Sequence, residues 1–77
     1  MNVRVGLYNE LKGYAPGGAG TFTQDLPPGA RLEDLLHTLG IPLHLERVSL
    51  VNGRRAADDT PLRDGDDVVL FPPLSGG

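Results

Sequence analysis

The chain has 77 residues, no Cys and no Trp, with 39% hydrophobic residues, 22% charged residues and a net charge of −3 at pH 7. These values predict one small folded domain whose thin core no disulfide can reinforce, and the negative charge argues against nucleic acid as a partner. No apolar run is long enough to cross a membrane, and the first residues lack the apolar core of a signal peptide, so we expect a cytoplasmic protein.

The first part of the chain predicts two strands joined by a long connection. Apolar residues alternate with other residues over 3–8 and again over 21–26, which is typical of strands with one buried face. Residues 9–14 have no clear period and indicate a helical turn from which Leu11 reaches the core. The Gly-rich segment 16–20 is typical of a loop, so we expect the two strands to form a hairpin.

One helix is the clearest element of the sequence. Leucines recur at i, i+3, i+4 and i+7 over residues 32–39, so they share one helix face. Gly40 is well placed as the left-handed residue that ends the helix, and Pro42 prevents its continuation. No hydroxyl side chain stands near Arg31, so the start of the helix is expected to be weakly capped.

Two further strands are predicted in the second half of the chain, over 48–51 and 67–71. The dipeptide Asn52-Gly53 after the first of them is a strong turn signal. The region between the strands is polar and turn-rich, and Leu62 is expected to reach the core from it. Pro72-Pro73 ends the last strand, because proline has no backbone N–H to donate.

The predicted fold class is α+β, with a mixed sheet and one main helix packed on one of its faces. The predicted core consists of the inward-facing apolar residues of these elements: Val3, Val5, Leu7, Phe22, Leu26, Leu32, Leu35, Leu36, Leu39, Val48, Leu50, Leu62, Val68 and Leu70.

A candidate contact surface lies on the other side of the last strand. Because Val69 and Phe71 alternate with core residues, they are predicted to face away from the helix. Together with Val51 and Leu74 they would form an exposed apolar patch, which usually marks a contact surface. The alternative is that the 9–20 segment covers them.

Other groups of residues offer little chemistry. The Gly-rich loop lacks the Lys-Ser/Thr that follows a phosphate-binding loop, and His37 and His44 lack partners with metal-ligand spacing. We therefore expect the chain itself to bind no cofactor and no metal. The aspartates of segment 58–67 are either solvated turn residues or a docking patch for a basic partner. The arginine pair after the Asn-Gly turn has the same two interpretations, with an acidic partner.

The C-terminal Gly76-Gly77 is the most specific feature of the sequence. Without side chains, these residues can pass through a narrow channel and approach another protein's active site closely. The terminal carboxylate is the reactive group at the tip, and it must be activated before it reacts with an amine or a sulfur donor. Activation by ATP needs a nucleotide site that this chain lacks, so a partner must supply it. Pro72-Pro73 stiffens the base of this tail, which we place at residues 72–77.

Taken together, these motifs resemble the ubiquitin-like sulfur carrier family. The resemblance covers essentially the whole chain, and it depends on the order and spacing of motifs that are individually weak. The Phe-Pro-Pro-x-x-Gly-Gly ending looks most like the small subunit of molybdopterin synthase. The motifs lie at residues 29–36, 51–53, 62–68 and 71–77.

The resemblance implies a single β-grasp domain over residues 1–77 and a role as a non-catalytic sulfur donor. An E1-like enzyme would use ATP to adenylate the carboxylate of Gly77, and a sulfurtransferase system would convert it to a thiocarboxylate. The tail would then insert into the large subunit of molybdopterin synthase and give its sulfur to a pterin precursor during molybdenum cofactor biosynthesis. The residues implied in partner binding are Val69, Phe71, Pro72, Pro73, Leu74, Ser75 and Gly76.

Three alternatives remain open from the sequence. The chain could carry sulfur for another pathway, such as thiamine, cysteine or tRNA thiolation, although thiamine-branch carriers usually lack the Phe-Pro-Pro segment. It could be a ubiquitin-like modifier that Gly77 links to lysines of other proteins, or a domain that only mediates interactions.

Overall fold

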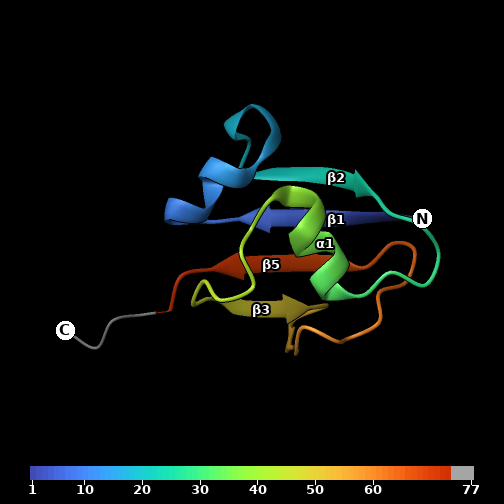
Figure 1. Ribbon diagram of the computed structural model, residues 1–77. Helices are drawn as coiled ribbons and strands as arrows, with labels where there is room; N and C mark the ends of the chain where they lie inside the picture. The colour runs from blue at the N-terminus through green and yellow to red at the C-terminus, as the bar shows by residue number, and fades with distance from the viewer. Residues whose placement is uncertain (74–77) are drawn as a thin grey trace.

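A five-stranded mixed sheet with one α-helix across one face forms the computed structural model, which describes residues 1–73 (Figure 1). The strands are β1 (Asn2–Leu7), β2 (Thr21–Asp25), β3 (Val48–Val51), β4 (Arg54–Arg55) and β5 (Asp67–Phe71), and the helix is α1 (Leu32–Leu39). Two short 3-10 helices, η1 (Asn9–Tyr14) and η2 (Pro16–Gly18), connect β1 to β2. The predicted α+β class is confirmed.

The strand order is β2-β1-β5-β3-β4, with β1 and β5 parallel and the other neighbours antiparallel. The carboxyl ends of β1 and β5 therefore lie side by side at the same end of the sheet. At that end the backbone N–H of Tyr8 donates to the carbonyl oxygen of Leu70 at 3.2 Å. The start of η1 and the segment that follows β5 thus leave the sheet side by side.

Backbone groups of a distant loop cap the start of α1. The N–H of Leu32 donates to the carbonyl oxygen of Thr60 at 2.9 Å, and that of Glu33 donates to Asp58 at 2.8 Å. The Asp34 carboxylate accepts the N–H of Arg31 at 2.8 Å. These bonds satisfy donors that a helix start leaves without an internal partner, so α1 forms without the hydroxyl cap whose lack the sequence indicated.

The end of α1 agrees with the sequence prediction. Gly40 has φ 77° and ψ 18°, and its N–H donates to the carbonyl oxygens of Leu36 and His37. Among the described residues, no helix is both long and apolar enough to cross a membrane.

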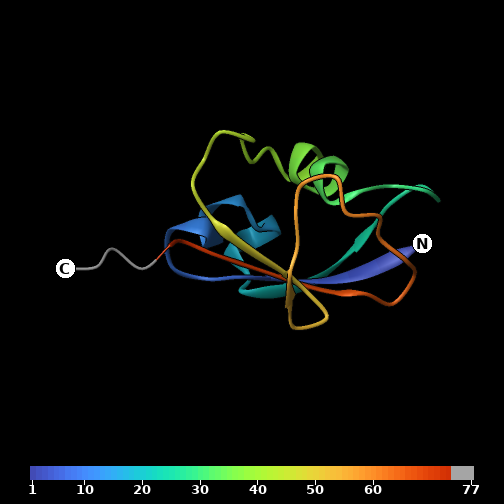
Figure 2. The same ribbon diagram turned by 90° about the horizontal axis from the view of Figure 1, so that it is seen from below.

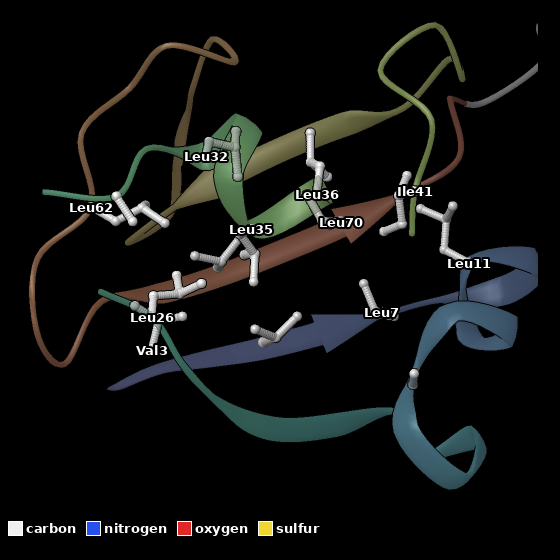
Figure 3. Close-up of a cluster of buried hydrophobic side chains, with 14 residues drawn as sticks. Val3, Leu7, Leu11, Leu26, Leu32, Leu35, Leu36, Ile41, Leu62 and Leu70 are labelled. Carbon is white, nitrogen blue, oxygen red and sulfur yellow. The ribbon is translucent and has the colours of Figure 1, made fainter. Parts of the chain in front are cut away.

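The core fills the space between α1 and the sheet (Figure 3). Most of the predicted core residues are buried there, while Phe22 and Leu39 are partly buried and pack against the cluster. Leu11 is buried as predicted, and Leu62 enters from its loop as predicted. The buried apolar residues are Val3, Val5, Leu7, Leu11, Ala15, Leu26, Ala30, Leu32, Leu35, Leu36, Ile41, Leu62, Val68 and Leu70.

The predicted orientation of β3 is wrong. Ser49 pairs with Leu70 and is only 4% exposed, so the core side of β3 carries the serine. Val48 and Leu50 are half-buried and share the opposite side of the sheet, while Val51 packs against the core. The apolar pattern of Val-Ser-Leu-Val fits either orientation, and the pairing with β5 selects this one.

The turn after β3 forms as predicted, but it leads into a strand that the sequence pattern did not reveal. Asn52 and Gly53 both have positive φ, at 52° and 82°, as a tight hairpin turn requires. The following β4 contains only Arg54 and Arg55, which are both exposed. Two exposed residues show no alternation of apolar and polar side chains, so periodicity cannot identify such a strand.

Candidate functional site

The face of the sheet opposite α1 carries a cluster of apolar side chains that we call the outer face. Figure 2 shows that α1 lies on one side of the sheet, and the outer face is the opposite side. Register places Leu50 beside Val69 on that side, and Val48 beside Phe71. The outer face consists of Tyr8, Val48, Leu50, Val69 and Phe71.

Gly6 lies beneath the outer face, between two of its side chains. A Cβ placed on Gly6 would lie 3.8 Å from Cε2 and Oη of Tyr8 and 3.8 Å from Cγ2 of Val69. The Tyr8 ring therefore lies over the glycine, which is buried although it has no side chain. Tyr8 itself is 47% exposed, so its ring continues the apolar surface towards the end of β1.

The predicted contact residues are only partly brought together. Val69 and Phe71 face away from the helix as predicted, and both are half-buried. Pro72 is half-buried and Pro73 is exposed, directly after the end of β5. Val51, predicted to join them, lies on the core side instead because it pairs with Val68.

The remaining predicted site residues are Leu74, Ser75, Gly76 and Gly77, and they lie outside the described residues. The predicted tail, 72–77, is therefore described only at its first two residues. Their roles in partner binding and sulfur transfer stay predictions.

The connection between β1 and β2 leaves the outer face open. Leu11 of η1 and Ala15 after it are buried in the core cluster that fills the space between α1 and the sheet. The alternative that this segment covers Val69 and Phe71 is therefore wrong. Tyr8, which precedes this segment, lies over Gly6 instead.

Sequence reasoning missed three members of the outer face. Tyr8 belongs to the predicted alternation of β1 as an outward residue, but the sequence pattern does not assign it to the apolar patch. The sequence pattern predicts Val48 and Leu50 in the core, and only the pairing of β3 with β5 reveals their side. Arg55 pairs with Leu50, and thus places a positive charge at the border of the outer face.

The acidic segment mainly shapes its own loop. The Asp64 carboxylate accepts a hydrogen bond from the backbone N–H of Asn2 at 2.7 Å. The Asp66 carboxylate accepts one from the backbone N–H of Arg63 at 2.8 Å and one from the side-chain amide of Asn52 at 2.9 Å. Asp58 forms an ion pair with Arg47 at 2.8 Å. The interpretation as turn residues accounts for Asp64 and Asp66, and the ion pair accounts for Asp58, so a docking role is not needed to explain these three carboxylates.

A shallow cavity of about 380 Å³ lies at the opposite end of the sheet, where β5 begins. It is lined by Val51, Asn52, Pro61, Arg63 and Asp66. Both carboxylate oxygens of Asp66, the acidic residue of this lining, accept hydrogen bonds within the loop. Among residues 1–73, no group of three His, Cys, Asp or Glu side chains is placed to hold a metal ion.

The sheet order, the crossing helix and the exposed outer face define a ubiquitin-like β-grasp domain. A family model described as the ThiS family matches residues 6–77 of the chain. The chain belongs to the ThiS family, and is thus a ubiquitin-like sulfur carrier of the kind that the resemblance indicated.

Solved structures agree with this assignment. The crystal structure of SAMP1 from Haloferax volcanii is 27% identical, with a TM-score of 0.81 and complete coverage of both chains. The putative molybdopterin converting factor subunit 1 from Pyrococcus furiosus is 28% identical, with a TM-score of 0.76, over 96% of this chain and 99% of that one.

A third similar structure is a protein–protein complex of subunits 1 and 2 of the molybdopterin-converting factor from Helicobacter pylori. The matched chain is 25% identical, with a TM-score of 0.67 and complete coverage of both chains. The comparison with curated proteins found no match.

Proposed function

We propose that this chain is the small, sulfur-donating subunit of a molybdopterin synthase. The observation that carries the proposal is the continuity of the outer face with the tail: Val69 and Phe71 face outward at the end of β5, and Pro72-Pro73 follow at once. A partner that binds this face would hold the start of the tail, and so aim the terminal glycines into its own active site.

The chemistry is completed in partner proteins. An E1-like adenylating enzyme joins the carboxylate of Gly77 to AMP, using ATP and releasing pyrophosphate. The terminal sulfur of a sulfurtransferase persulfide then displaces AMP to form an acyl disulfide. A thiol of the partner system cleaves its S–S bond, which leaves the thiocarboxylate and a disulfide. The large synthase subunit receives the tail, and the thiocarboxylate sulfur passes to a pterin precursor. In this scheme the chain is a co-substrate, and it needs no cofactor of its own.

Two comparisons support this choice among the sulfur-carrier pathways. One similar structure is a putative molybdopterin converting factor subunit 1, and another is a complex of subunits 1 and 2 of such a factor. The Phe-Pro-Pro segment before the glycines also favours this branch.

Intact mass measured after purification from the cells of origin tests the proposal. We expect a subpopulation whose mass has increased by the replacement of one oxygen with sulfur, located at Gly77. Deletion of Gly77 should abolish this species and the transfer of sulfur, while the circular dichroism spectrum stays that of the intact domain. Full sulfur transfer by the deletion variant would overturn the mechanism.

A second function, conjugation to other proteins, is favoured by the similarity to SAMP1, which another solved structure describes as a small archaeal modifier protein. In this case the Gly77 carboxylate forms an isopeptide bond with a lysine of a target protein. Covalent adducts that survive boiling in detergent and reducing agent would indicate this function, and adducts are not expected from a carrier that only donates sulfur.

A further inference from the structure

The chain contains a single lysine, Lys12, among seven basic residues. A primary amine is the acceptor in isopeptide formation, whereas the arginine guanidinium stays protonated and does not act as a nucleophile. Only two groups of this chain can therefore accept an activated carboxyl group as amines: Lys12 and the α-amino group of Met1. These two amines differ in their exposure to solvent and in their hydrogen bonds.

The α-amino group of Met1 is held within the fold. It donates to the carbonyl oxygen of Leu26 at 2.8 Å and lies 3.6 Å from the carboxylate of Asp25. Its residue's side chain is only 8% exposed. It also lies at the end of the sheet where β1 and β5 begin, away from the root of the tail (Figure 1). An acyl donor would have to break these contacts before it could reach this amine.

The Lys12 amine is presented to solvent. Lys12 lies in η1, its side chain is exposed, and among residues 1–73 its ammonium group has neither an ion pair nor a hydrogen bond. Its stem passes near Gly20, where an added Cβ would lie 3.6 Å from the Lys12 Cε. The absence of a side chain at Gly20 thus leaves room for the stem.

Lys12 also lies at the tail end of the molecule. The segment η1 begins directly after Tyr8, whose N–H donates to Leu70 of β5, one residue before Phe71. The η1 helix also packs against β5. Lys12 and the root of the tail therefore lie at the same end of the fold.

We propose that Lys12 is the acceptor site for conjugation of this protein to itself, so that Gly77 of one copy becomes linked to Lys12 of another. The inference rests on the proposed adenylation of Gly77. The Lys12 nitrogen attacks the carbonyl carbon of the Gly77 adenylate, the C–N bond forms, and the C–O bond to AMP breaks. AMP leaves, and the amine gives one proton to solvent. The chains that result have a single linkage type, because each copy offers one accessible amine.

The test incubates the full chain with ATP, Mg²⁺ and the E1-like adenylating enzyme of the source organism, without a sulfur source. Release of pyrophosphate reports adenylation, and a denaturing gel reports linked dimers. Trypsin should then yield a branched peptide, in which residues 64–77 are attached to the uncut peptide 5–31. Lys12→Arg keeps the positive charge but should remove the dimers while pyrophosphate release continues.

Each outcome decides one part of the proposal. Adenylation with dimers that Lys12→Arg abolishes supports the inference. Adenylation without dimers, dimers linked through Met1, a cyclic monomer, or dimers that persist in Lys12→Arg would overturn it and leave the proposed function standing. A lack of pyrophosphate release would overturn the proposed function, and with it the acyl donor that this linkage requires.

Discussion

Arg47 and Asp58 join β3 to the loop that caps α1, with Arg47 Nη2 donating to Asp58 Oδ1 at 2.8 Å. The Arg47 side chain is 8% exposed, and its Nε has no hydrogen-bond partner among the described residues. The same Asp58 uses its backbone oxygen to cap the N–H of Glu33. This one residue thus links the helix start, the acidic loop and the sheet.

The first prediction concerns this ion pair. Asp58→Ala leaves a largely buried guanidinium without its carboxylate, so the free energy of unfolding should fall by about 1–3 kcal/mol. Urea unfolding followed by circular dichroism measures the change. Asp59→Ala alters the neighbouring exposed carboxylate and should change stability by no more than about 0.5 kcal/mol.

The double variant Arg47→Met, Asp58→Ala separates the effect of losing the ion pair from the cost of leaving a charged guanidinium buried without a partner. Because methionine removes the charge and keeps an apolar stem, this variant should be more stable than Asp58→Ala alone. Equal losses from Asp58→Ala and Asp59→Ala would contradict the role given to the pair.

The second prediction tests the orientation of β3. Ser49 faces the core, and its Oγ has no hydrogen-bond partner among the described residues. Ser49→Leu inserts a large side chain against Leu70, so stability should fall by about 1–3 kcal/mol. Ser49→Ala removes the unpaired hydroxyl and should leave stability unchanged or raise it by up to about 1 kcal/mol. Tolerance of leucine would instead place position 49 on the outer face.

Much of the fold follows from local patterns that the sequence displays openly. The alternation of Val3, Val5 and Leu7 predicts β1, and the leucine stripe of 32–39 predicts α1 with its bounds. Each pattern has one apolar side, so the sequence alone predicts which face of the element is buried. The same reasoning placed Val69 and Phe71 correctly, because Val68 and Leu70 between them belong to the core.

The features that local patterns missed depend on contacts between distant residues. Apolar residues occupy both faces of 48–51, so only the register with β5 decides which side is buried. The capping of α1 by the carbonyl oxygens of Asp58 and Thr60 involves backbone groups, which no side-chain pattern reveals. The chemistry of Gly77 lies beyond the described residues, so it depends on the sequence and on family membership.

The third prediction uses two glycines with different backbone conformations. Gly40 has φ 77°, a left-handed value that an L side chain disfavours, so Gly40→Ala should lower stability by about 1–2 kcal/mol. Gly13 lies in η1 without a positive φ, and nothing lies within 4 Å of an added Cβ. Gly13→Ala should therefore be neutral or stabilise by up to about 1 kcal/mol. Thermal and urea unfolding check both variants, and equal effects would contradict the conformational explanation.

The last prediction separates the outer face from the core with two adjacent residues of β5. Leu70 is fully buried, so Leu70→Ala should lower the free energy of unfolding by about 2–5 kcal/mol. Phe71 is half-buried on the outer face at the root of the tail, so Phe71→Ala should cost less than half as much stability. Binding to the purified large subunit of the synthase should nevertheless weaken at least tenfold, or about 1.4 kcal/mol, because aromatic anchors dominate such interfaces. Isothermal titration calorimetry at a temperature where both variants are folded measures this. If Phe71→Ala unfolds as readily as Leu70→Ala and binds with unchanged affinity, Phe71 acts as a core residue, and the outer face is not the docking surface.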